Sequence, residues 1–480
     1  MSITIAQRRV ALEDPHNSTD SADVLNVFDA LFDALVRRGA DGGYLPALAE
    51  SWEVSADART WTFHLREGVK FHSGDLVDAL AVEYCLRRMA RPDMGVTLGA
   101  PGVYSQYLTG ADVNVPDNKT VRITTVEPLA DLLDILVCGY ILPPDLLARD
   151  AASFAKKPVG SGPYQIVSYS EGEEIVVRRF EGYWGDRPPH DQITWRAYAA
   201  ENDRLAALKS GEVDIATRLH KATMGKLPEG LTICDYLDPT TYIYLLNTTK
   251  PPFDDPRLRK AINMAIDRPA VIANVLSGDG DPLTGFISPA HFGFDNEAAG
   301  IEFDPVAAKA LLAAAGYCDG LEIELDCPTS LPDEAESLSA EISRQLLKIG
   351  INVTVHTVQD RTAYAHQVRR KEIHDLCVFD SSPISTFRVL REKIDARTNG
   401  SWWQGYHKVA VEDLLDQACE TVDEPARLEI YRQCYRLLQE DPAWLYLYNH
   451  RYVTGLRGNH PDWRMPNNGI LDVRSLAKSI

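Results

Sequence analysis

The stretch Gly160-Ser-Gly-Pro-Tyr164, which continues to Trp195, decides how the fold is interpreted. Two glycines around a serine are typical of a loop that cradles phosphate, and such a loop must lead directly into a helix. Here β-favouring residues follow instead, at Ile166 to Tyr169 and again at Ile175 to Val177. A polar, glycine-containing loop separates the two runs, so they predict a β-hairpin. The stretch is therefore interpreted as scaffold and not as a phosphate site.

Length and charge exclude several classes of protein. A chain of 480 residues is too long for one compact core, so two or more lobes are expected. The formal net charge of -20 argues against nucleic acid as a partner, because its phosphates would be repelled. No run approaches the roughly 18 apolar residues that a membrane span needs. The nearest, Leu129 to Leu142, is too short and is interrupted by aspartates.

The sequence shows neither a signal peptide nor a metal-binding cysteine pattern. It leads straight from its first methionine into an expected strand at Ile3-Thr-Ile5, so either the protein is cytoplasmic or a targeting segment lies outside this sequence. The eight cysteines form no C-x-x-C motif, which argues against a metal knuckle or a redox site. Cys419 with Cys434 and Cys318 with Cys327 are candidate disulfides, and buried free thiols are the alternative.

Hydrophobic patterning divides the chain into two regions. Hairpin patterns within 41–157 predict a subdomain inserted after a first βα unit, whose helix is expected from Ser21 to Arg38. From about residue 200 onward, strands and helices alternate. Alternating residues at Leu321 to Leu325 and Val353 to Val355 flank a helical stripe and predict a βαβ unit. The apolar run Leu376 to Phe379 predicts a strand covered on both faces, so an α/β protein is expected.

Runs spread over nearly the whole chain carry a resemblance to a known family. They are Pro46-Ala-Leu-Ala-Glu-Ser-Trp52, Thr60 to Gly74, Gly160 to Tyr164 with Tyr183-Trp184, Asn247 to Asp267, Ala307 to Tyr317 and Leu346 to Val355. Together they resemble the extracytoplasmic solute-binding protein family 5, the peptide-, nickel- and opine-binding components of ABC importers.

The resemblance implies a two-lobe periplasmic-binding-protein fold of type II, similar to cluster C, with an extra subdomain in the first lobe. Lobe I is then expected at 1–40, 158–245 and 449–480, its inserted subdomain at 41–157, and lobe II at 246–448. The resemblance also implies a monomeric receptor, periplasmic or lipid-anchored outside the cell membrane. Such a receptor closes over its solute and delivers it to transmembrane permease subunits. No cofactor is expected.

Ligands of open α/β sheets bind beyond the carboxyl ends of strands, which points to the residues that follow Phe379. Asp380, Ser381 and Ser382 come directly after this apolar run and are expected to face the ligand. Arg388 suits a carboxylate or phosphate group, and a surface salt bridge is its alternative role.

An aromatic segment lies further along the same region. Trp402, Trp403 and Tyr406 fall outside any periodic pattern, and packing under neighbouring helices is as good an explanation as ligand contact. The family resemblance implies that this loop lines the pocket. The first lobe and the lobe crossing are expected to add Asn17, Gly139, Tyr140, Ser161, Tyr244 and Asn247.

The class of ligand stays open at this level. The run Asp380 to Tyr406 resembles the opine and sugar-phosphate members of the family more than the peptide members. Peptide binders of the family hold the ligand's amino group with an aspartate, for which Asp380 and Asp413 are candidates. A short peptide and a nickel chelate remain alternatives. A non-transport, chaperone-like peptide-binding module is the alternative from a different functional class.

Catalytic motifs do not occur in this sequence. The glycine-rich stretch lacks the G-x-S-x-G spacing, and the S-x-x-K matches have no accompanying S-D-N or K-T-G. His356, His366 and His374 could meet in space, although lone surface histidines are commoner. We therefore expect neither an enzyme nor a metal site.

Overall fold

A computed structural model describes residues 1–17, 20–39, 41–96, 102–149, 154, 156–225, 229–330, 332–474 and 476. The chain forms two compact units, one on either side of the boundaries Tyr236/Leu237 and Arg451/Tyr452. Both boundaries lie within long strands, β12 (Leu231–Leu246) and β17 (Trp444–Arg457), which carry the chain from one unit to the other. The two lobe junctions expected from the sequence fall within the same strands. Parts of the predicted segments 41–157 and 449–480 lie outside the described residues.

The first unit is organised around β1 (Ser2–Gln7), which pairs in parallel with both β10 (Gln192–Ala197) and β11 (Ile215–Leu219). The predicted hairpin is confirmed as β8 (Tyr164–Ser170) and β9 (Glu174–Arg179), and β9 extends the sheet beside β10. A strand and not a helix follows the glycine-rich stretch, which confirms its interpretation as scaffold.

A separate antiparallel sheet in this unit has the strand order β4-β5-β7-β6. Its strand β5 buries every second residue, because Trp61, Phe63 and Leu65 are all buried. The other elements of the unit are short. The elements between the first strand and the hairpin are α1 (Ala22–Leu31), β2 (Val36–Arg38), β3 (Tyr44–Pro46), β4 (Ala49–Val54), β5 (Thr60–Leu65), α2 (Ala79–Met89), α3 (Val103–Leu108), β6 (Asp112–Asp117), β7 (Thr120–Thr124), α4 (Leu132–Leu136) and α5 (Pro144–Arg149), and those near β11 are α7 (Glu201–Ser210) and α8 (Lys221–Met224).

The first helix is shorter than the sequence predicts, since α1 ends at Leu31 and the chain turns into β2. The glycine-rich stretch passes directly over this end of the helix. Gly162 donates its backbone N–H to the oxygen of Leu31 at 3.0 Å, and a Cβ on Gly160 or Gly162 would collide with backbone atoms of Leu31. The apolar pattern misled the prediction because the extended segment buries its own apolar residues, among them Leu35.

Asp33, just beyond α1, ties this stretch to two other segments. Its carboxylate accepts hydrogen bonds from Ser161 Oγ at 3.2 Å, Trp184 Nε1 at 3.0 Å and Arg474 Nη2 at 3.2 Å. Asp33 and Ser161 are both buried, so these bonds lie in the interior of the unit. The glycines therefore allow the close approach, and the polar side chains fix it.

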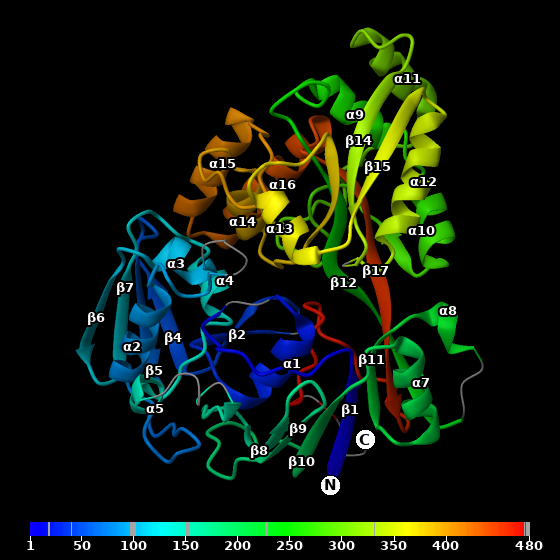
Figure 1. Cartoon of the computed structure of the whole chain (residues 1–480). Coiled ribbons are helices and arrows are strands. Elements are labelled where there is room, and N and C mark those ends of the chain that lie inside the picture. Colours follow the sequence, from blue (N-terminus) through cyan, green and yellow to red (C-terminus); the bar gives the residue numbers. More distant parts are fainter. Residues whose placement is uncertain are drawn as a thin grey trace. The chain divides into compact units, whose positions relative to one another are not determined.

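The second unit contains the predicted βαβ unit, formed by β14 (Leu321–Pro328), α12 (Ala335–Leu347) and β15 (Ile351–Val358). β14 also pairs in parallel with β16 (Leu376–Ser381), so the carboxyl ends of all three strands lie at one edge. One face of the sheet packs on α10 and α12, through residues such as Leu338 (Figure 1).

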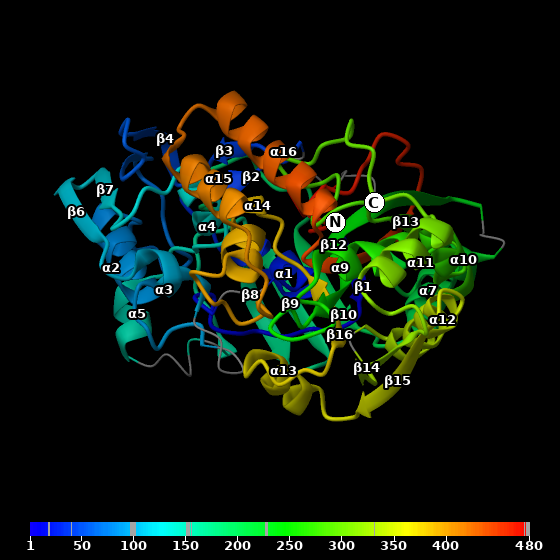
Figure 2. The same ribbon diagram turned by 90° about the horizontal axis from the view of Figure 1, so that it is seen from above.

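Further helices complete the second unit. α15 (Val409–Glu420) and α16 (Glu424–Glu440) lie side by side (Figures 1 and 2). Among the described residues, no helix combines the length and the apolar character that crossing a membrane requires. The remaining elements are α9 (Pro256–Met264), α10 (Arg268–Leu276), β13 (Gly280–Pro282), α11 (Pro305–Ala314), α13 (Arg361–Arg369), α14 (Thr386–Val389) and the π-helical turn η1 (Leu390–Ile394).

The two disulfides considered from the sequence are wrong, since all eight cysteines are free thiols. Cys419 faces Arg391, whose Nη2 lies 3.6 Å from its sulfur, while Cys434 is buried. Cys318 is exposed and Cys327 is buried beside Ser339, so the second pair occupies opposite environments.

The close approach of the glycine-rich stretch to Leu31 makes a prediction about stability. Gly160→Ala should lower the free energy of unfolding by about 1–3 kcal/mol, because the added methyl overlaps backbone that cannot move aside. Gly43→Ala is the matched control, because its added carbon would meet Asp41 Oδ1 at 3.4 Å, an ordinary contact. Denaturant titration measures both changes. Equal midpoints for the two variants would contradict this role of the stretch.

Candidate functional site

Helix α13 stands at the sheet edge where β14, β15 and β16 end. It begins with Arg361, close after β15, and Asp360 caps it by accepting hydrogen bonds from two backbone N–H groups of its first turn. Tyr364 fixes the helix against the sheet, because its hydroxyl donates to the oxygen of Val378 at 2.6 Å. Arg361 and Arg369, at the two ends of α13, are thereby held beside the end of β16.

These two arginines carry donors that the protein does not use. Nε of Arg361 and both Nε and Nη1 of Arg369 are buried, and they have no hydrogen-bond partner in the part of the chain that the structure describes. Burial, together with the nearby charge of Arg361, lowers the pKa of Arg369 to about 10. Buried donors on a cation are costly to leave unpaired, so the pair favours an anion.

Aromatic rings surround the two guanidinium groups. The rings of Phe379 and Trp402 lie 4.4 Å apart. The guanidinium carbon of Arg369 stands 5.0 Å from the centre of the Trp402 ring, and that of Arg361 stands 5.8 Å from the Phe379 ring. Rings at these distances attract the cations and give a flat surface on which part of a solute can stack.

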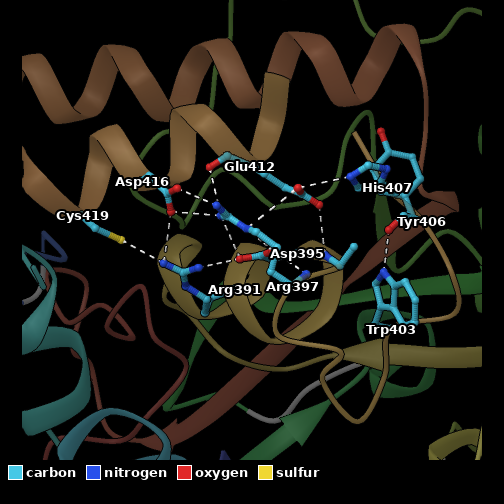
Figure 3. A network of polar contacts seen from close by, with 10 residues as sticks. Arg391, Asp395, Arg397, Trp403, Tyr406, His407, Glu412, Asp416 and Cys419 are labelled. Atoms are coloured by element: carbon cyan, nitrogen blue, oxygen red, sulfur yellow. Dashed lines mark hydrogen bonds and ion pairs between the residues drawn. The ribbon is translucent and has the colours of Figure 1, made fainter. Parts of the chain in front are cut away.

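The loop that presents Trp402 is held by a polar network (Figure 3). Arg397 donates to Asp395 at 2.9 Å and to Asp416 at 2.5 Å, and Trp403 donates its Nε1–H to the oxygen of Tyr406 at 2.5 Å. On the other side, the Lys371 ammonium donates to backbone oxygens at the start of the loop. Burial lowers the pKa of Lys371 to about 8. The loop is therefore fixed before any ligand binds.

The end of β16 adds polar atoms next to Phe379. Burial raises the pKa of Asp380, and the positive charges of Lys393 and Arg361 act in the opposite direction. Ser381 is buried, and its Oγ has no hydrogen-bond partner among the described residues. Ser382 is half-buried. Asp380 offers a negative group on the same edge as the two arginines, so a solute with both signs of charge fits the site.

Arg388 and Tyr406 have hydrogen-bond partners within the protein. Arg388 is buried and its Nε donates to Glu392 at 2.9 Å, so it forms an ion pair inside the protein and not the surface salt bridge considered as its alternative role. Tyr406 is buried, donates its hydroxyl to the oxygen of Asp441 at 2.9 Å and packs its ring beside a third arginine, Arg259. Their contacts with a ligand, like that of Trp403, stay predictions.

The other residues expected at the site also have internal partners. Tyr244 is buried with its hydroxyl 3.1 Å from Ser339 Oγ, and the Asn247 amide donates to the backbone oxygens of Ile373 and His374. Asn247 thus fixes the segment that leads into β16.

The corresponding residues of the first unit are placed as follows. Gly139 is buried, as is Tyr140, whose hydroxyl donates to Asp29 at 2.6 Å. Asn17 is exposed and accepts from the N–H of Gly95 at 3.2 Å, while the two residues after it lie outside the described chain. Ser161 is fully buried and hydrogen-bonded to Asp33 in the interior of the unit. The roles of these residues in ligand binding stay predictions.

Sequence reasoning missed Arg361, Arg369 and the part played by Phe379. Ligands of open α/β sheets bind beyond the carboxyl ends of strands, and this rule led to Asp380 at the end of one predicted strand. The strand predicted at Val353 to Val355 was not treated in the same way. Applied to β15, the same rule leads directly to Arg361. Arg369 carries no such signal, because its place depends on how α13 packs.

Two compact units connected through two long strands form a two-lobe α/β architecture. The family model for bacterial extracellular solute-binding proteins, family 5, matches residues 43–386. The chain belongs to this family, whose members are substrate-binding components of ABC importers.

Several proteins are similar over nearly the whole chain. The glutathione-binding protein GsiB of Escherichia coli (strain K12) is 27% identical over 471 residues, which are 95% of this chain and 90% of that protein. The structure of AgaA from A. tumefaciens R10 in complex with agropinic acid is 28% identical, with a TM-score of 0.78 and coverage of 95% and 93%. HbpA2 from Haemophilus parasuis, at 21% identity and a TM-score of 0.84, covers 98% of both chains. These similarities confirm the two-lobe periplasmic-binding-protein fold.

The raised pKa of Asp380 predicts a specific dependence of stability on pH. The folded protein holds a proton at Asp380 more tightly than the unfolded chain, where the carboxyl has its ordinary pKa near 3.8. Stability is therefore lost as the pH rises through the raised pKa. Asp380→Asn removes this loss, so its advantage over wild type in the free energy of unfolding should grow with pH.

Chemical denaturation over a series of pH values measures this advantage. Asp413→Asn, at an exposed position of α15, is the control and should follow the wild-type pH dependence. An advantage of Asp380→Asn that does not change with pH would show that the carboxyl is not destabilised by burial.

Proposed function

We propose that this protein is the receptor of an ABC importer for a small solute that carries a carboxylate, and that Arg361 and Arg369 bind this group. The observation that carries the proposal is the set of unpaired, buried donors on the two arginines. A carboxylate accepts hydrogen bonds from such donors and offsets their charge. Trp402 then stacks against the adjoining part of the solute, and Asp380 receives an ammonium group.

The relatives support a solute of this kind. Glutathione and agropinic acid, the ligands named for GsiB and AgaA, both carry carboxylates. A peptide of two or three residues or an opine supplies a carboxylate and an amino group within one small molecule. A sugar phosphate offers the anion but no ammonium group for Asp380. We therefore place short acidic peptides and opines ahead of sugar phosphates and nickel chelates.

The same proposal assigns the protein a place and a partner. The relatives are periplasmic or extracellular binding proteins, so we infer that this chain works outside the cytoplasmic membrane and passes its solute to transmembrane permease subunits. Solute binding shifts such a receptor toward a closed form only through contacts that are stronger in that form. Binding without chemical conversion is the function that these residues support.

Ligand titration tests the arginine pair directly. Glutathione, an opine, a sugar phosphate and an uncharged dipeptide amide are titrated by calorimetry into protein stripped of co-purified solute. We expect the carboxylate-bearing solutes to bind, and Arg369→Gln and Trp402→Ala each to lower the affinity at least tenfold, about 1.4 kcal/mol. Arg369→Gln removes one of the two cations that bind the carboxylate, and Trp402→Ala removes the surface on which the solute stacks.

Arg370→Gln is the matched control. Arg370 is exposed, is the next residue along the chain and is paired with Glu372 at 2.7 Å, so its loss removes equal charge outside the site. Unchanged affinity in Arg369→Gln, or equal weakening in Arg370→Gln, would reject the arginine pair as the anion site. If only the uncharged dipeptide amide bound tightly, the proposal that the solute carries a carboxylate would be rejected.

A further inference from the structure

A second cluster of polar side chains lies on the sheet of the second unit and shares no residue with the anion site. Glu324 on β14, His356 on β15 and His374 just before β16 each direct one ligand atom into it, and these atoms all lie within 4.8 Å of one another. His356 and His374 thus meet, as the sequence allowed, with Glu324 as the third member of the cluster in place of His366. Glu324 and Asp326 are two residues apart on one strand and so lie on the face opposite the buried Ile323 and Leu325.

The distances in the cluster match those around a metal ion. Nε2 of His374 is 3.5 Å from one carboxylate oxygen of Glu324, and Nε2 of His356 is 3.6 Å from the other. Both distances exceed the usual range of a hydrogen bond. Zn²⁺ bonds of about 2.0–2.1 Å place neighbouring ligand atoms of a tetrahedron about 3.4 Å apart. The three ligand atoms lie within 4.8 Å of one another, so a small rearrangement of side chains brings them to the separation found around one ion.

Asp326 holds the His374 ring in an orientation suitable for binding a metal ion. Its buried carboxylate accepts from His374 Nδ1 at 2.7 Å and from the backbone N–H of His374 at 2.8 Å. With the proton held on Nδ1, the lone pair of Nε2 faces Glu324. Histidines that bind a metal through one ring nitrogen commonly donate the N–H of the other ring nitrogen to a carboxylate.

His356 presents an unused nitrogen to the same gap. Its Nε2 is buried and has no hydrogen-bond partner among the described residues. The two imidazoles stack with ring centres 4.4 Å apart, so one ring must turn for both nitrogens to reach one ion. His356 is the ring able to turn, because it lacks the carboxylate that fixes His374.

We propose that Glu324, His356 and His374 bind a divalent first-row transition metal ion such as Zn²⁺. Two imidazoles and one carboxylate suit Zn²⁺, Ni²⁺ or Cu²⁺ and not the hard ions Mg²⁺ or Ca²⁺. All three side chains are about 40–50% exposed, at 51%, 40% and 39% for Glu324, His356 and His374. The ion therefore keeps at least one coordination position open to water or to a group from another molecule. This site goes beyond the solute receptor function and does not depend on it.

Zinc binding to tag-free, chelator-treated protein tests the proposal. Calorimetry should show one zinc ion per chain, and His356→Ala and Glu324→Gln should each weaken the binding at least tenfold. Both substitutions leave the bonds of Asp326 with His374 in place, so unfolding without zinc should match wild type. Co²⁺ provides a second measurement, because its visible absorption should show nitrogen and oxygen ligands in the wild type and should change in both variants.

His407→Ala is the matched control. His407 is also exposed and lies 3.4 Å from a carboxylate, that of Glu412, but it is not part of a three-residue ligand cluster among the described residues. Its loss should leave the zinc affinity of the site unchanged. No saturable zinc binding by the wild type, or equal affinity in wild type and His356→Ala, would overturn the proposal. Arg369→Gln should retain zinc binding, which separates this site from the solute site.

Discussion

The parallel pairing of β14 with both β15 and β16 is the constraint on which the functional surfaces of the second unit depend. Parallel strands end at the same edge, so the helix that follows β15 starts beside the last residues of β16. This places Arg361 near Phe379 and Asp380, although many residues separate them along the chain. The same register sets His356 opposite Asp326 and brings Glu324 close to the segment that carries His374. Both proposed sites thus follow from one pattern of backbone hydrogen bonds.

The proposed solute site is a region where the protein leaves its own electrostatics incomplete. Two other arginines of this unit, Arg388 and Arg391, have carboxylate partners in Glu392 and Asp395. Buried donors without partners raise the free energy of the unliganded protein, and a bound anion relieves that cost. The energy stored in this way appears as affinity when the solute binds. The loop that carries Trp402 contributes in a second way. Because hydrogen bonds already hold this loop in place, little conformational entropy is lost when the solute binds.

Much of the fold could be predicted from the sequence because it depends on local periodicity. The hairpin after Gly160, the βαβ unit and the paired helices near the C-terminus each have a pattern that ends at recognisable turn residues. The length of α1 could not be predicted, because the helix ends where a glycine-rich stretch that is distant in sequence packs against Leu31. The two candidate disulfides were wrong because spacing along the chain does not reveal which way a thiol faces.

For the candidate site, the prediction was strongest where a residue directly follows a strand. Asp380 and Ser381 were expected beyond the apolar run and form the last two residues of β16, and Trp402 stood out as an aromatic residue in an irregular segment. The contacts of these three residues with a ligand stay predictions. Arg369 could not be found from the sequence, because its proposed role depends on the packing of Tyr364 and on two buried donors that have no partner among the described residues. Arg388 had the chemistry of an anion ligand, but a glutamate four residues later on the same helical segment supplies an internal partner.

The most direct test of this account compares two forms of one solute. The best-binding carboxylate-bearing solute and its analogue with that carboxylate converted to a carboxamide are titrated into the wild-type protein under identical conditions. If buried, unpaired guanidinium groups provide the affinity, the carboxamide should bind more weakly by about 2–5 kcal/mol, at least thirtyfold in the dissociation constant. Equal dissociation constants for the two forms would contradict the central claim that the arginine pair recognises the anion.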